Sequence, residues 1–90
     1  MPTIHLLIKG KVQGVFYRAS AKEKADQLHL TGWVKNTEDG HVEAVASGPQ
    51  EAIDQFITWC KQGPKKAVVT DVQIKPLSEE TFAQFLVIRG

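Results

Sequence analysis

The segment that most plainly offers chemistry is Gly10–Arg18, which reads GKVQGVFYR and contains no acid, histidine or thiol. We predict that it forms a loop between a strand and a helix. Backbone N–H groups in such a loop and in the first helical turn have no intrahelical acceptor, and the helix dipole adds about half a positive charge there. Gly14 permits a left-handed turn, and the planar guanidinium of Arg18 grips two oxygens of a phosphate.

The pattern of this loop leaves two interpretations open. In the functional one, the N–H groups and Arg18 form a cradle for an anion. In the structural one, the glycines serve the turn geometry and Arg18 pairs with a nearby carboxylate. A nucleotide-binding loop of the Walker A type is disfavoured, because Val15 and Phe16 follow Gly14 where that motif needs Lys and Ser or Thr.

A second candidate, Asn36, closes the stretch GWVKN directly before the turn TEDG. Asparagine is common at strand ends, where its side chain caps the following turn. Its amide also accepts a hydrogen from water and holds the water in line with an electrophile without being consumed. The residue alone does not decide between these two roles.

The elements that position these residues follow from hydrophobic periodicity and turn residues. We expect strands at residues 3–9, 32–36, 41–46, 67–76 and 85–89, and a helix at residues 17–28. Gly10 would end the first strand and Pro76 the fourth. A second helix would begin within SGPQEA, with Ser47 or Gly48 as its cap and Pro49 in its first turn, and would stop at Gly63.

The order β-α-β-β-α-β with an extra C-terminal strand predicts an α+β fold. It is the ferredoxin-like α/β sandwich, a mainly antiparallel sheet with two helices on one face. The apolar spacing of Ile53, Phe56, Ile57 and Cys60 marks the buried side of the second helix. This fold serves enzymes, metal carriers and RNA-binding proteins, so the function must be argued from the site.

Composition excludes several other classes. Residues 1–90 are short enough for one domain, and 11 Lys and Arg against 10 Asp and Glu give a net charge of +1, which disfavours binding to nucleic acid or to a membrane surface. Cys60 alone forms neither an intrachain disulfide nor a structural zinc site, and the three histidines lack metal-site spacing. We therefore expect a cytoplasmic monomer without metal or cofactor.

Together the two candidate segments resemble the acylphosphatase family. Its first motif has the form aliphatic-x-G-x-V-Q-G-V-x-F-R, and residues 8–18 read IKGKVQGVFYR. Its second has the form G-W-V-x-N-x-x-x-G-x-V-x-x-x-x-x-G, and residues 32–48 read GWVKNTEDGHVEAVASG. The GP at 63–64 and the terminal FLVIRG fit the same family. Tyr17 stands where the family usually has Phe, and it adds a hydroxyl beside Arg18.

The resemblance implies a small enzyme that hydrolyses acyl phosphates to a carboxylate and inorganic phosphate. By position, Arg18 would bind the phosphoryl group and Asn36 would orient the attacking water. The backbone amides of Gln13, Gly14, Val15, Phe16 and Tyr17 would hold the phosphoryl oxygens. The alternative is a non-catalytic module that binds phosphate or carbamoyl phosphate.

Such a site contains few catalytic groups, and an acyl phosphate explains why they suffice. Its leaving group is a carboxylate, which is already stable as an anion, so the reaction needs no general acid. Positioning and electrostatic stabilisation of the phosphoryl oxygens supply most of the catalysis of phosphoryl transfer. The proton of the water passes to the phosphate itself or to solvent.

Overall fold

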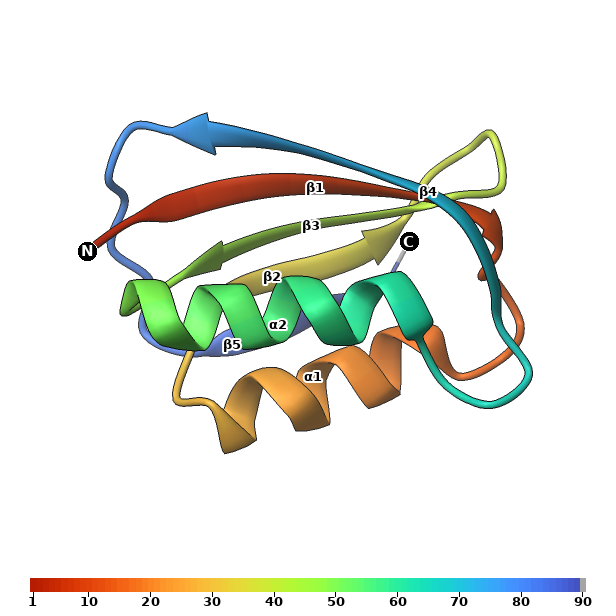
Figure 1. Cartoon of the computed structure of the whole chain (residues 1–90), viewed down its shortest axis with the longest axis horizontal. Coiled ribbons are helices and arrows are strands. Elements are labelled where there is room, and N and C mark those ends of the chain that lie inside the picture. Colours follow the sequence, from red (N-terminus) through yellow and green to blue (C-terminus); the bar gives the residue numbers. More distant parts are fainter. Residues whose placement is uncertain (90) are drawn as a thin grey trace.

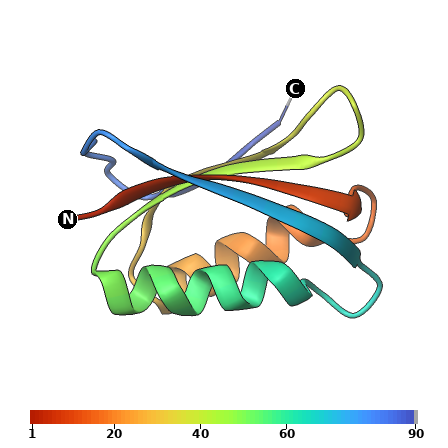
Figure 2. The ribbon, with the colours of Figure 1, turned by 45° about the horizontal axis from the view of Figure 1, so that its top comes forward.

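The computed structural model describes residues 1–89, and these form five strands and two helices. In chain order they are β1 (Thr3–Lys11), α1 (Tyr17–Gln27), β2 (Thr31–Asn36), β3 (Val42–Ser47), α2 (Gln50–Gln62), β4 (Val68–Leu77) and β5 (Phe85–Ile88). The strands make one sheet in the order β4-β1-β3-β2-β5 (Figure 1). Both helices cover the same face of that sheet (Figure 2). The predicted ferredoxin-like fold is thereby confirmed.

Strand direction brings three strand ends to one edge of the sheet. β1 and β2 both pair antiparallel with β3, which lies between them, so they run parallel to each other. β5 pairs parallel with β2, with Trp33 opposite Leu86. The carboxyl ends of β1, β2 and β5 therefore point the same way, and the chain segments that follow them meet beyond the sheet.

The core lies between the sheet and the helices, as the periodicity predicts. Alternate residues of β1 are buried, as is the predicted stripe of α2 except Ile57, which is half-buried. Ala21 and Ala25 bring α1 close to the sheet because their side chains are small. The ring of Phe56 meets that of Phe85 edge-on at 5.8 Å, so α2 holds β5 in place.

Gly10 does not end β1, as the sequence predicted, but forms an irregularity within it. The pairing with β4 shifts register between Lys9 and Gly10 and then continues to Lys11. Gly10 has a φ of 129°, and a Cβ there would lie 2.1 Å from the carbonyl oxygen of Val68. Glycine is needed because the neighbouring backbone fills the space of a side chain.

Two prolines occupy other positions in their helix or strand than the sequence predicted. Pro49, not Ser47 or Gly48, is the N-cap residue of α2, and Ser47 belongs to β3, where its hydroxyl accepts a hydrogen bond from Thr3. Pro76 lies inside β4 instead of ending it. An edge strand tolerates proline because one side of its backbone has no neighbouring strand to bond.

Candidate active site

The ends of the three parallel strands and the start of α1 lie at the right of Figure 1. A pocket of about 340 Å³ is lined by residues from these segments. Both candidate segments contribute to it. Its lining comprises Val12, Gly14, Phe16, Tyr17, Arg18, Ala19, Asn36, Val87 and Arg89. The two segments are separated by α1 in the sequence, and the fold brings them together.

The loop before α1 presents backbone N–H groups without protein acceptors. Within residues 1–89, no backbone N–H of residues 13–19 donates to another protein group. Gly14 has a φ of 74° and Phe16 a φ of 62°, so the chain turns twice through left-handed conformations. Phe16 is the N-cap residue of α1 and supplies no side-chain cap. Open N–H groups at a helix start are suited to an anion.

The guanidinium of Arg18 is held by the far end of the chain. Its Nη1 donates a hydrogen bond of 3.1 Å to the backbone carbonyl of Ile88, at the end of β5. No carboxylate of residues 1–89 lies within ion-pair distance of it, so the described structure lacks the ion pair of the structural interpretation. Hydrogen bonding to a neutral carbonyl fixes the side chain without cancelling its charge.

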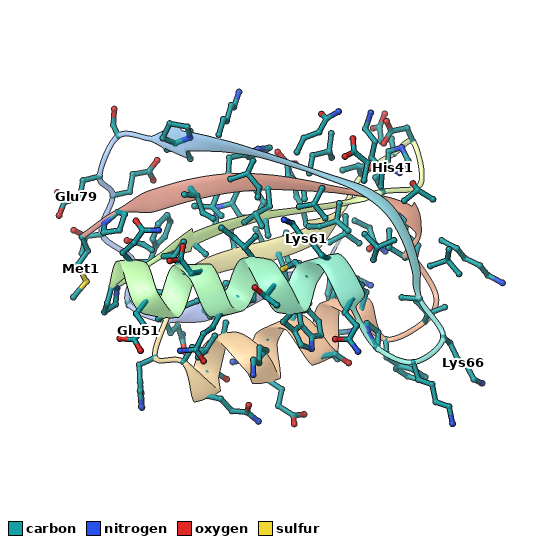
Figure 3. The ribbon with its side chains drawn as sticks, viewed as in Figure 1. Met1, His41, Glu51, Lys61, Lys66 and Glu79 are labelled. Carbon is teal, nitrogen blue, oxygen red and sulfur yellow. The ribbon has the colours of Figure 1, made fainter. Side chains whose placement is uncertain are left out.

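Asn36 is the last residue of β2 and reaches the pocket half-buried. It is paired with Val42 of the neighbouring strand β3. The turn that follows is closed by a hydrogen bond from the Thr37 N–H to the His41 carbonyl, and Gly40 adopts a φ of 92° within it. The predicted Asp39-Gly40 turn is thus present, and His41, which follows it, is labelled in Figure 3.

Gln13 connects the loop to that turn. Its side-chain Nε2 donates to the carbonyls of Thr37 and His41, at 2.8 Å in each case. Gly14, Phe16 and Tyr17, three of the predicted phosphate-binding residues, line the pocket, whereas Gln13 and Val15 are not among its lining residues. Gln13 thus joins the loop to the segment that follows Asn36.

The hydroxyl of Tyr17 is turned toward α2. It donates a buried hydrogen bond of 2.7 Å to the carbonyl of Cys60, one of the last carbonyls of that helix. Burial raises the pKa of Tyr17 well above its usual value, and burial also raises the pKa of the Cys60 thiol to about 12. The ring lies 5.3 Å from that of Trp59. The departure from the family's phenylalanine therefore ties the start of α1 to the end of α2.

Arg89 and Val87 line the pocket but were not among the residues singled out from the sequence. Only the parallel pairing of β5 with β2 places them there. In residues 1–89 no group of His, Cys, Asp and Glu side chains is arranged to hold a metal ion. The helices of this part of the chain are too short or too polar to cross a membrane.

Comparison with known proteins gives a consistent result. The sequence model of the acylphosphatase family matches residues 4–87. An acylphosphatase of Methylococcus capsulatus is 47% identical over 90 residues, which cover 99% of this chain and 98% of that protein. The crystal structure of acylphosphatase from Bacillus subtilis superimposes with a TM-score of 0.96 at 36% identity, covering 99% of this chain and 100% of that one.

A third similarity is to the structure of an acylphosphatase from Coxiella burnetii. It has a TM-score of 0.94 and 42% identity, and it covers 97% of this chain and 92% of that one. Sequence and fold therefore agree over nearly the whole length of each protein. The chain belongs to the acylphosphatase family.

Proposed function

We propose that this protein hydrolyses the carboxyl–phosphate bond of acyl phosphates. The observation that carries the proposal is the meeting of three kinds of group at one pocket. These are the open N–H groups of the loop, the guanidinium of Arg18 and the side chain of Asn36. The membership of the family, shown over residues 4–87, supports the same activity.

Arg18 and the loop amides hold the phosphoryl group in this mechanism. Gly14, Phe16 and Tyr17 line the pocket, and the N–H groups of these residues and of Gln13 and Val15 form one run of open donors. Charge spreads over the phosphoryl oxygens in the transition state, and donors already in place stabilise it without reorganising. The hydrogen bond from Arg18 to Ile88 provides such preorganisation for the cation.

Asn36 orients the water that attacks phosphorus. The water oxygen forms a new bond to phosphorus while the bond from phosphorus to the acyl oxygen breaks, and the electron pair leaves with the carboxylate. The water proton passes to a phosphate oxygen or to solvent. A carboxylate leaves without protonation, which accounts for a pocket to which residues 1–89 contribute no acid or histidine.

The near-neutral net charge of +1 supports a small-molecule substrate, and the single cysteine supports a reducing compartment such as the cytoplasm. A monomer is supported by the apolar side of α2, which is buried against the sheet and needs no partner. Gel filtration at two protein concentrations tests the monomer. A shift toward a larger species at the higher concentration would contradict it.

Hydrolysis of benzoyl phosphate, followed by ultraviolet absorbance, tests the activity. We expect release of benzoate far above the rate in buffer, with inorganic phosphate as a competitive inhibitor. Heat-denatured protein serves as the control for contaminating metal or buffer catalysis. Release at the buffer rate despite tight phosphate binding would instead indicate a non-catalytic phosphate-binding or carbamoyl-phosphate-binding module.

A further inference from the structure

Phe16 is a large apolar side chain that the fold leaves in water at the pocket. Its exposed fraction is 80%, whereas Tyr17 and Phe56 are 2% and 0% exposed. It also borders the pocket, where Val12 is buried and Val87 half-buried. A single exposed apolar side chain is ordinary on a protein surface, but this ring is exposed at the pocket itself, where a ligand can cover it.

The backbone of Phe16 is also in a conformation that is strained for a residue with a side chain. With φ 62° and ψ 23° it lies in the left-handed region, where glycine is the least strained residue. Strained residues of this kind cluster at ligand sites, where the surrounding structure holds them. A glycine would satisfy the turn, and the chain has a phenylalanine instead.

The position of the bound phosphoryl group determines what can reach this ring. The loop amides and Arg18 occupy the inner part of the pocket around the phosphoryl oxygens, and the acyl group is bonded to that same phosphorus through oxygen. The acyl group must therefore extend away from the phosphoryl oxygens that these donors hold. Of the apolar side chains in the lining, Phe16 is the large one that is exposed and can be covered by a ligand.

We propose that the ring of Phe16 packs against the acyl group of the substrate and gives the enzyme a preference for acyl phosphates with an aromatic acyl group over compact ones such as acetyl phosphate. This inference rests on the proposed function and adds a substrate class to it. Contact between two aromatic groups provides favourable energy that an acetyl methyl group is too small to match.

The variant Phe16→Ala isolates the ring. Alanine keeps the Cβ and therefore the strain of the left-handed backbone, so the loop conformation is not relaxed as it would be by glycine. Phe16 lies outside the buried core, so the variant retains the stability of the fold. Phe16→Tyr keeps the ring and serves as the conservative variant. Leu86→Ala is the matched control, because Leu86 is 49% exposed and is not among the pocket-lining residues.

The experiment measures kcat/KM of each variant with benzoyl phosphate and with acetyl phosphate, and the inhibition constant of inorganic phosphate. For Phe16→Ala we expect a loss of about five- to tenfold with benzoyl phosphate, the scale of an aromatic contact. A loss with acetyl phosphate, or in the inhibition by phosphate, reports on the loop and the Phe16 amide, so the ratio between the two substrates is the measure of the ring itself. Phe16→Tyr and Leu86→Ala keep the preference of the unmodified protein.

Two results would overturn the inference. An unchanged ratio between the two substrates in Phe16→Ala would show that the ring makes no contact with the acyl group. Equal losses on both substrates, with weaker phosphate inhibition, would show that Phe16 acts on the loop instead. If the unmodified protein hydrolysed neither substrate, the proposed function itself would fail and this inference with it, so the two failures are distinguishable.

Discussion

The side-chain Nε2 of Gln13 donates a hydrogen bond of 2.8 Å to the backbone carbonyl of Thr37. This contact joins the loop before α1 to the turn that follows Asn36, and a second bond from the same nitrogen reaches His41. Gln13 therefore helps to hold the loop before α1 beside the strand end that carries Asn36.

Replacement of Gln13 tests this dependence. In Gln13→Ala both carbonyls lose a partly buried donor, which costs about 1–2 kcal/mol of unfolding free energy. We expect kcat to fall more than phosphate affinity, because the loop and Arg18 remain while Asn36 is less well placed. Urea unfolding and inhibition by phosphate measure the two effects. Full kcat in a destabilised Gln13→Ala would show that the bond serves the fold alone.

Arg18→Gln removes the cation of the pocket. We expect loss of both phosphate inhibition and turnover, the latter by about a hundredfold or more, as for other donors to a transition state. Arg18→Lys recovers only part, because a lysine lacks the planar fork. Lys61→Gln on α2 (Figure 3) removes an equal charge away from the pocket and is the control. Full activity in Arg18→Gln would contradict the proposal that Arg18 binds and stabilises the phosphoryl group.

Asn36→Ala separates water positioning from phosphate binding. The variant keeps Arg18 and the open amides, so we expect inorganic phosphate to inhibit as it does in the unmodified protein. Turnover of benzoyl phosphate should fall by about a hundredfold, since the attacking water is no longer oriented. Steady-state kinetics with phosphate as inhibitor gives both values. Parallel losses in both would contradict the assigned role.

Tyr17→Phe removes the hydroxyl that bonds to Cys60 and restores the family's usual residue. The buried carbonyl of Cys60 loses its donor, which costs about 1–2 kcal/mol of unfolding free energy at neutral pH. We expect kcat with benzoyl phosphate to remain within about twofold, because the hydroxyl contacts α2 and not the pocket contents. A large loss of activity at unchanged stability would contradict this placement.

The same variant has a pH dependence of known sign. The pKa of Tyr17 is raised on folding, so above about pH 10 the unfolded chain releases a proton that the native chain keeps. The contribution of this proton to the free energy of unfolding is therefore complete below about pH 10 and is lost as the pH rises further. Urea unfolding at pH 8 and pH 10.5 measures the slope, which Tyr17→Phe should reduce. Part of the decrease in unfolding free energy that remains in Tyr17→Phe at alkaline pH comes from Cys60, because burial raises its pKa as well.

Local patterns accounted for much of this structure. The alternation of Ile4, Leu6 and Ile8 and the helical spacing of Ile53, Phe56 and Cys60 predicted which faces are buried, because each depends on a single element's period. The Asp39-Gly40 turn was equally local. Arg18 and Asn36 were identified from their motifs, and the fold brings both to one pocket.

Features that depend on pairing between distant segments were not predictable in the same way. Arg89 reaches the pocket only because β5 lies parallel to β2, a register that no local pattern in FLVIR specifies. Pro76 was expected to end its strand, but its tolerance depends on β4 being at the sheet edge. The bonds of Gln13 likewise require the loop and the hairpin turn to be placed first.

The bond from Arg18 to Ile88 joins residues 70 positions apart. A chain synthesised only as far as β3 already contains Arg18 and Asn36, but the Ile88 carbonyl that fixes the guanidinium has still to be made. A partly synthesised chain carries both motifs without a finished binding site. The site is therefore complete only after β5 has been synthesised and has paired with β2.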